Sequence, residues 1–208
     1  MRSPRSENDA AFIGLTGGVA AGKSKALEIL ASLGAETLSS DAVVHDLLAT
    51  ERVRDLLVAR WGERVAPGGT VDRGHVASIV FEDPGELAWL ERTLHPLVRE
   101  RVADWRARLP EATLLAVVEV PLLFETGLDS AFDATISIVA PNPVRAERAG
   151  ARGTSDLEGR SRRQLTQDEK ASRATYVVDN AGTVDELARN LAALVAELAP
   201  GAAVEGER

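Results

Sequence analysis

The 208-residue chain has no cysteine, and it has only three lysines against 21 arginines. The absence of cysteine excludes disulfides, thiolate metal sites and cysteine nucleophiles. The three histidines (His45, His75 and His95) are scattered without ligand-like spacing, which argues against a zinc site. No apolar run approaches the ~18 residues that a membrane-spanning helix needs. The composition is otherwise that of an ordinary globular protein, with 45% hydrophobic and 27% charged residues.

The chain also lacks an excess of positive charge: it is acidic, with a formal net charge of −8. A general attraction to nucleic acid or to an anionic membrane is therefore not expected. The polar segment 1–9 lacks the apolar core of a signal peptide, and we expect it and residues 199–208 to be disordered tails. The length between them, residues 11–198, suits a single domain with small inserted lobes.

Short apolar runs separated by helical patterns predict the fold. Helical periodicity is present over 23–33, over 42–109 with breaks at 67–69 and 83–85, and over 184–198, where Thr183 and Glu186 form a capping box. We expect strands over residues 11–16, 35–40, 113–120, 134–140 and 175–179. Strands that alternate with helices in this way are typical of an α/β protein with a five-stranded parallel sheet flanked by helices.

The segment Gly17–Ser24 reads GGVAAGKS, which satisfies the phosphate-binding pattern G-x-x-x-x-G-K-[ST]. It follows a predicted strand and opens a predicted helix, which is the context that the pattern requires. The glycines let backbone N–H groups turn inward around a phosphate, and the helix N-terminus favours an anion. Lys23 would reach the β- and γ-phosphates of a nucleotide, and the Ser24 hydroxyl would bind Mg²⁺.

Two of the three lysines, Lys23 and Lys25, lie in this segment. A compact ammonium can follow a phosphoryl group as a point charge, whereas the wider planar fork of arginine does not fit the same cradle. Scarce lysine is therefore kept where arginine cannot replace it. Lys25 either approaches phosphate or is a solvated residue of the first helical turn, and we favour the second interpretation.

The rest of the sequence narrows the class of phosphate-loop protein. There is no N-K-x-D segment to read guanine and no L-S-G-G-Q-like stretch of a transporter ATPase. Residues 145–173 carry eight basic and five acidic side chains, a net charge of +3, which leaves −11 for the rest of the chain. Arg148 and Arg152 share a helical face, and Arg160 and Gln164 repeat the spacing. This segment is either a lid that closes over polyphosphate or a solvated helix with surface ion pairs.

Several segments that run nearly end to end, over about residues 11–198, resemble the dephospho-coenzyme A kinase family. They are GLTGGVAAGKS, LSSDAVVHDLL, VDRGHVASIVFEDP, LERTLHPLVR, VVEVPLLFETGL, RAERAGAR, GRSRRQLTQDEK and YVVDNAGTVDEL. The resemblance implies a P-loop kinase with a helical acceptor-binding lobe over about 42–109 and a lid over about 145–173. It further implies cytoplasmic transfer of the ATP γ-phosphoryl group to the ribose 3′-hydroxyl of dephospho-CoA with Mg²⁺. We expect no nucleic acid or membrane partner, and a monomer is favoured.

By the same resemblance Asp41 is the catalytic acid/base, acting together with Lys23 and Arg148. A carboxylate there could orient the acceptor hydroxyl and accept its proton. The residues alone leave a second interpretation equally open, because Asp41 could cap a helix that begins at Ala42. Glu119, late in a predicted strand, either helps to hold Mg²⁺ through water or is a buried structural acid.

The resemblance assigns the remaining positions as well. His95, Arg99 and Leu122 join Asp41 in binding the acceptor, although His95 before Pro96 could instead mark a loop-to-helix joint with a packed imidazole. Arg148 contacts the transferred phosphate, while Arg152 and Arg160 are weaker candidates for the same contact. The nucleotide-binding residues are Gly17, Gly18, Val19, Ala20, Ala21, Gly22, Lys23, Ser24, Lys25, Arg152, Asn180 and Gly182, with Ser24 as the metal ligand.

Four positions depart from the family pattern. Ala20 replaces a usual glycine, Ser39 a frequent Asp, Lys25 a common Thr and Thr175 a usual Asp. None removes an essential role, although Ser39 could weaken binding of Mg²⁺ or acceptor. The competing functions are another P-loop small-molecule or nucleotide kinase, which would differ in the acceptor lobe, and a non-catalytic nucleotide-binding regulator.

Overall fold

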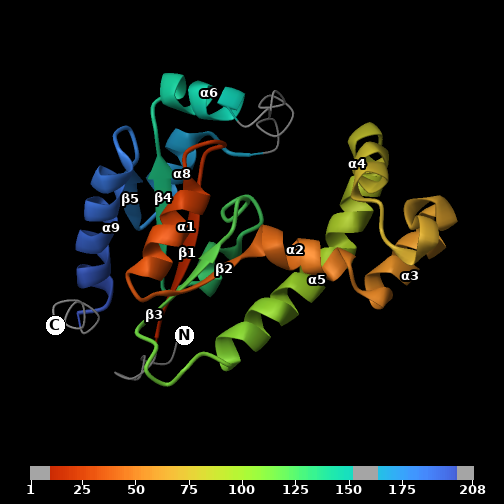
Figure 1. Ribbon diagram of the computed structural model, residues 1–208, viewed down its shortest axis with the longest axis horizontal. Coiled ribbons are helices and arrows are strands. Elements are labelled where there is room, and N and C mark those ends of the chain that lie inside the picture. Colours follow the sequence, from red (N-terminus) through yellow and green to blue (C-terminus); the bar gives the residue numbers. More distant parts are fainter. Residues whose placement is uncertain (1–9, 152–163, 201–208) are drawn as a thin grey trace. The chain divides into compact units, whose positions relative to one another are not determined.

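A computed structural model describes residues 10–151 and 164–200 of the chain (Figure 1). The described residues belong to two compact units, which we treat separately. The sheet unit comprises the described parts of Met1–Ser39 and Leu109–Arg208, and the helical unit is Ser40–Arg108. None of the described helices is long and apolar enough to cross a membrane.

The sheet unit is built on five parallel strands in the order β2-β3-β1-β4-β5. The predicted five-stranded α/β fold is therefore confirmed, with strand ends that differ from expectation by at most two residues. Ser40, which we expected at the end of the second strand, instead begins a helix. The strands are β1 (Ala11–Gly17), β2 (Glu36–Ser39), β3 (Leu115–Glu119), β4 (Ala134–Val139) and β5 (Tyr176–Asp179).

The central strand β1 divides the core of this unit into two faces, because successive side chains of a strand alternate. Ile13 and Leu15 are fully buried in a cluster with the apolar faces of α1 (Lys23–Ser32) and α9 (Val184–Leu198). These two helices pack against each other and lie side by side in Figure 1. On the opposite face Phe12 stacks on Phe132 with ring centroids 4.8 Å apart. The loop after β1 is thus held on a strand that is buried on both faces.

The helix boundaries of the sheet unit follow recognisable signals. Helix α1 ends at Ser32, and Gly34 has a left-handed backbone (φ 88°), as expected of the residue that stops it. The predicted capping box at α9 is confirmed, because Thr183 and Glu186 bond to each other in both directions. The unit also contains a 3₁₀ turn, η3 (Leu128–Ala131), and helices α6 (Asn142–Ala151) and α8 (Gln167–Arg173). Ala199, which we expected in the C-terminal tail, is buried.

The helical unit contains α2 (Ser40–Leu48), α3 (Glu51–Trp61), α4 (Arg73–Glu82) and α5 (Pro84–Ala107). The expected break at 67–69 is a short 3₁₀ turn, η2 (Pro67–Gly69), which follows another, η1 (Glu63–Val65). The second expected break is only one residue wide: Asp83 caps α5, and Pro84 is its first residue. Helix α5 contacts both α2 and α4, so it forms the spine of this unit.

Candidate active site

The segment Gly17–Ser24, the P-loop, connects the end of β1 to the first turn of α1. Gly17 and Gly22 both have positive φ, 149° and 100°. A Cβ at Gly17 would lie 2.4 Å from the carbonyl oxygen of Ile138, and one at Gly22 would lie 2.1 Å from Nδ2 of Asn180. Both glycines of the motif are therefore required by the fold. Gly22 is also the N-cap of α1, so no capping side chain competes for the N–H groups of the first turn.

Lys23 curls back over the loop that precedes it. Its ammonium donates to the carbonyl oxygens of Gly17 and Gly18 at 3.2 and 3.1 Å, and the side chain is half-buried. Ser24 is exposed in the first turn of α1, where its hydroxyl is accessible to a ligand. Lys25 is exposed and forms an ion pair with Glu28, which is the arrangement expected of a solvated first-turn residue.

Ala20 has an unusual backbone conformation. Its φ is 59°, and among the described residues it alone has a positive φ without being glycine. The left-handed region costs an L-residue roughly 1–2 kcal/mol. The sequence showed only that an expected glycine was missing here, whereas the structure shows that the conformation for which glycine is suited has been kept.

Arg145 contacts the P-loop at Val19 and Gly18, a role that the sequence analysis did not assign to it. Its Nε donates to the carbonyl oxygen of Val19 at 2.8 Å, and its Nη1 donates to Asn142 at 3.2 Å. The guanidinium lies against Gly18, where a Cβ would be 3.2 Å from Cζ. The available signal was weak, because Arg145 was one of many arginines in the basic segment and lies 126 residues from Val19.

Arg148 and Asn180 meet beside the same loop. Asn180 is buried, its Nδ2 donates to the carbonyl oxygen of Ala21 at 2.7 Å, and its Oδ1 accepts from Nη2 of Arg148 at 3.5 Å. The other terminal nitrogen of Arg148, Nη1, is buried and has no hydrogen-bond partner among the described residues. Arg148, predicted to contact the transferred phosphate, and Asn180, predicted to bind nucleotide, therefore lie together at the P-loop. Arg152 and Arg160, the other arginines predicted for this site, lie outside the described residues.

Gly182 lies against the capping box of α9, where a side chain would require the Glu186 carboxylate to shift. A Cβ there would lie 1.9 Å from Oε2 of Glu186, the oxygen that accepts the Thr183 N–H at 2.7 Å in the capping box of α9. This interaction also lowers the pKa of Glu186, chiefly through the backbone and hydroxyl hydrogen bonds from Thr183. The expected role of Gly182 in nucleotide binding is a separate prediction that this geometry does not require.

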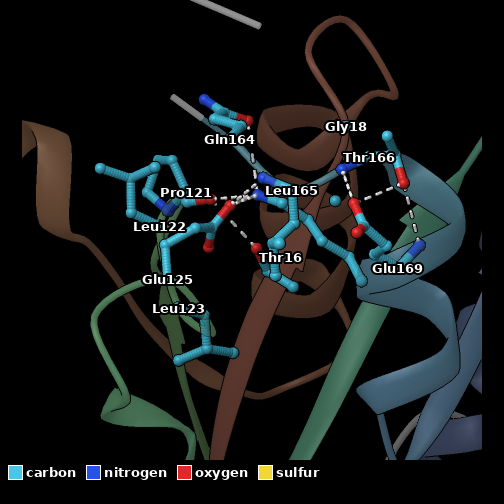
Figure 2. Close-up of polar contacts among 12 residues, drawn as sticks. Thr16, Gly18, Pro121, Leu122, Leu123, Glu125, Gln164, Leu165, Thr166 and Glu169 are labelled. Atoms are coloured by element: carbon cyan, nitrogen blue, oxygen red, sulfur yellow. Dashed lines mark hydrogen bonds and ion pairs between the residues drawn. The ribbon is translucent and has the colours of Figure 1, made fainter. Parts of the chain in front are cut away.

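The loop after β3, Pro121–Gly127, is held by a buried polar network (Figure 2). Lys170 of α8 is fully buried, donates to the carbonyl oxygen of Pro121 and pairs with Glu125 at 3.1 Å. Glu125 also accepts the Leu165 N–H at 2.8 Å. Burial lowers the pKa of Lys170, and the interaction with Glu125 opposes that shift. Leu122, predicted to bind the acceptor, is half-buried within this loop.

Glu119, the last residue of β3, is 6% exposed. A carboxylate at this depth suits a structural acid as well as an outer ligand of a metal ion. No group of three Asp, Glu or His side chains that could enclose a metal was found in the part of the chain that the structure describes. A Mg²⁺ ion bound mainly by phosphate oxygens and water would need no such cluster.

The remaining predicted residues lie on the helical unit. Asp41 is exposed and is the second residue of α2, which begins at Ser40. The interpretation of Asp41 as a helix N-cap is therefore wrong. His95 is half-buried in the middle of α5, which continues through Pro96, so the alternative of a loop-to-helix joint is wrong too. Arg99 is exposed on the same helix, four residues later and thus on the same face as His95.

Comparisons with known proteins point to one family. The family model described as dephospho-CoA kinase matches residues 11–186. A dephospho-CoA kinase from Synechococcus sp. (strain CC9902) is 37% identical over 189 residues, covering 88% of this chain and 94% of that protein. One from Thermus thermophilus is 38% identical over 194 residues, covering 92% and 93%. The crystal structure of a Thermus thermophilus protein superposes with a TM-score of 0.79 at 35% identity, covering 91% of this chain and 98% of the other.

These matches include the P-loop, all five strands and the inserted helical unit, and they extend over nearly the full length of the relatives. A phosphate-binding loop shared with many unrelated proteins would not produce such coverage. The chain therefore belongs to the dephospho-CoA kinase family of ATP-dependent phosphotransferases.

Proposed function

We propose that the protein transfers the γ-phosphoryl group of ATP to the ribose 3′-hydroxyl of dephospho-CoA, yielding CoA and ADP. The observation that carries the proposal is an intact P-loop in a chain that the dephospho-CoA kinase model matches over residues 11–186. This reaction would complete the synthesis of coenzyme A. We further propose that the enzyme acts as a cytoplasmic monomer without nucleic acid or membrane partners, in keeping with its net charge of −8.

The P-loop residues fit a polyphosphate. The N–H groups at the start of α1 have no capping side chain, and Gly17 and Gly22 adopt the positive φ angles that let the backbone turn around a bound anion. Lys23 already reaches the loop that would surround the phosphates. Arg148 presents a buried guanidinium nitrogen that has no hydrogen-bond partner among the described residues. We assign Lys23 and Arg148 to stabilising charge on the transferring phosphoryl group.

Mg²⁺ fits the same site through the exposed Ser24 hydroxyl, with Glu119 as a candidate outer ligand through water. When bound, the ion would neutralise charge on the β- and γ-phosphate oxygens. The protein's own contribution is to keep the hydroxyl at the first turn of α1, beside the lysine that neutralises the same phosphates. Removal of Mg²⁺ by EDTA should therefore abolish turnover.

The acceptor is activated by Asp41 in this proposal. The carboxyl ends of parallel strands lie along one edge of a sheet, and Asp41 follows the end of β2 by two residues. Its carboxylate takes the proton of the ribose 3′-hydroxyl as that oxygen bonds to the γ-phosphorus, and the bond from the γ-phosphorus to the bridging oxygen breaks to release ADP. His95, Arg99 and Leu122 are assigned to holding dephospho-CoA.

The decisive experiment incubates the purified protein with ATP, Mg²⁺ and dephospho-CoA and quantifies CoA and ADP by chromatography. Pantothenate, adenosine and nucleoside monophosphates serve as control acceptors. We expect CoA and ADP in equal amounts and little product from the controls. Turnover of a control acceptor in place of dephospho-CoA would identify another small-molecule kinase, and ATP binding without any turnover would identify a nucleotide-binding regulator.

A further inference from the structure

The P-loop residues Val19, Ala20 and Ala21 include one unfavourable backbone conformation, at Ala20, and a side-chain contact on each side of it. Ala20 has a left-handed backbone with φ 59°. The carbonyl oxygens of its two neighbours, Val19 and Ala21, each accept a hydrogen bond from a side chain far along the sequence, Arg145 at 2.8 Å and Asn180 at 2.7 Å. A strained conformation persists only where its surroundings determine it. The two contacts on either side of Ala20 are such surroundings.

The planarity of the peptide bond makes these contacts relevant to phosphate binding. The carbonyl of Val19 and the N–H of Ala20 belong to one planar trans peptide group, so they point in opposite directions. The same holds for the carbonyl of Ala21 and the N–H of Gly22. A side chain that holds either carbonyl on the outside of the loop therefore directs the following N–H to its other side, where a phosphate would be bound.

We propose that Arg145 and Asn180 are positioning residues that brace the P-loop by holding the Val19 and Ala21 carbonyls, so that the Ala20 and Gly22 N–H groups remain directed at phosphate. The inference rests on the proposed use of ATP, but not on the identity of the acceptor. Neither residue needs to touch the reacting atoms. Each acts through the backbone of the loop.

Two glycines of the P-loop, Gly18 and the motif glycine Gly22, lie against the side chains of the brace. Gly18 occupies a variable position of the pattern, yet a Cβ there would come within 3.2–3.4 Å of three atoms of the Arg145 guanidinium. A Cβ at Gly22 would come within 2.1 Å of the Asn180 amide nitrogen. The absence of side chains at 18 and 22 therefore lets both braces approach the loop closely.

The Asn180 side chain suits a fixed role of this kind. It is buried, and both ends of its amide are satisfied, one by the Ala21 carbonyl and the other by Arg148. Asn180 thus links the brace to the arginine that we assign to the transferring phosphate. Arg145 is likewise fixed at two points, because Asn142 at the start of α6 accepts from its Nη1.

The test measures ATP affinity by isothermal titration calorimetry for Arg145→Ala and Asn180→Ala. Loss of one brace should weaken ATP binding roughly tenfold, the scale of one hydrogen bond to a charged or buried group. Arg189→Ala, which changes an exposed arginine of α9, is the matched control and should bind ATP normally. Unchanged affinity in the Arg145 variant, or an equal loss in the control, would overturn the proposal.

The second arm combines each brace variant with Ala20→Gly and measures the ATP affinity of the double variant. Glycine adopts the left-handed conformation without penalty, so the loop should need its braces less, and Ala20→Gly should restore most of the lost ATP affinity. A contribution from the charge of Arg145 alone, or from general stability, predicts the same loss with either residue at position 20. That additive result would refute the brace.

The remaining variants keep the test decisive. Arg145→Lys retains the charge but not the planar contact with Gly18, so it should bind ATP less tightly than the wild type, and full affinity would contradict the brace. If Asn180→Ala does not fold, the Arg145 series alone decides. Since ATP binding needs no acceptor, a protein that binds ATP but leaves dephospho-CoA unchanged would refute the proposed function without affecting this result.

Discussion

The P-loop and the loop Pro121–Gly127 leave the neighbouring strands β1 and β3 at their carboxyl ends, and a lysine contacts each of them. Lys23 belongs to the P-loop itself, is half-buried and donates to carbonyls five and six residues away. Lys170 comes from a separate helix, is fully buried and is paired with Glu125. A lysine expected to bind phosphate can thus be recognised locally, whereas a lysine that holds the fold is recognisable only from its distant partners.

This difference leads to distinct expectations for substitutions. Changes at the P-loop and its chemical partners should lower activity while the free energy of unfolding stays nearly constant. Changes in the network of Lys170 should lower the free energy of unfolding first. The variants below test this distinction, beginning with the largest expected effect.

Asp41→Asn should lower kcat by about 10²–10⁴, the usual contribution of a positioned base, because an amide cannot take the acceptor proton. ATP affinity and thermal stability should stay nearly unchanged. Since α2 begins at Ser40, helix capping by Asp41 is not at stake. Asp46→Asn, an exposed acid on the same helix, is the control and should retain full activity. A fully active Asp41→Asn enzyme would mean that another group accepts the proton.

Lys23→Arg should come next, with turnover nearly abolished by a fall in kcat of about 10²–10³. The charge is retained, but the planar guanidinium does not fit where the ammonium contacts the Gly17 and Gly18 carbonyls. The measurement is steady-state kinetics together with a thermal unfolding midpoint, which should match that of the wild type. Near-normal turnover would contradict the explanation that we give for lysine in an arginine-rich chain.

Arg148→Ala should lower kcat by about 10², more than it weakens ATP binding, because its guanidinium is assigned to charge that develops during transfer. Comparing kcat with the dissociation constant for ATP separates the two effects. Arg189→Ala on α9 is the control. If only the KM for ATP rises, Arg148 binds the ground state, and its assignment to the lid chemistry is wrong.

The same contrast explains how far the sequence could predict the molecule. The five strands, the stop at Gly34 and the capping box at Thr183 depend on neighbouring residues, so their patterns were readable. The partners of Arg145 and Asn180 lie 126 and 159 residues away, and no local pattern specifies them.

The start of α2, which we misplaced, and the path of α5 through Pro96, where the helical periodicity competed with a proline signal, illustrate the same limit. Ser39, Ser40 and Asp41 are all of the types that commonly cap helices, so the local sequence does not specify at which of them α2 begins. Pro96 normally disfavours a helix interior. Here α5 continues through it because Leu94 and Leu97, on either side, are buried in the unit's core. Burial in the tertiary structure has overridden the local preference.

Lys170→Met tests the structural side of the comparison and should leave ATP affinity nearly unchanged. The substitution leaves the Glu125 carboxylate buried without its cation, and breaking a buried ion pair in this way typically costs about 3–5 kcal/mol. The measurement is urea unfolding at pH 7. Lys25→Met, which breaks the exposed pair with Glu28, is the matched control and should cost far less. The double variant Lys170→Met/Glu125→Gln should recover part of the loss because no buried charge remains.

The pH dependence of this loss follows from the lowered pKa of Lys170. As pH rises from that lowered value toward the ordinary pKa of 10.5, the native state releases the proton before the unfolded state does. The unfolded state then binds more protons, so this group adds stability with rising pH and loses that contribution as pH falls through its native pKa. The Lys170→Met variant lacks this group, so the difference in free energy of unfolding between wild type and variant should widen across this alkaline range. Groups that titrate alike in the two proteins cancel in that difference. Urea unfolding of both proteins from pH 8 upward measures the difference. A deficit that narrows would mean that attraction to Glu125 outweighs burial, and that Lys170 is held chiefly by its charge partner.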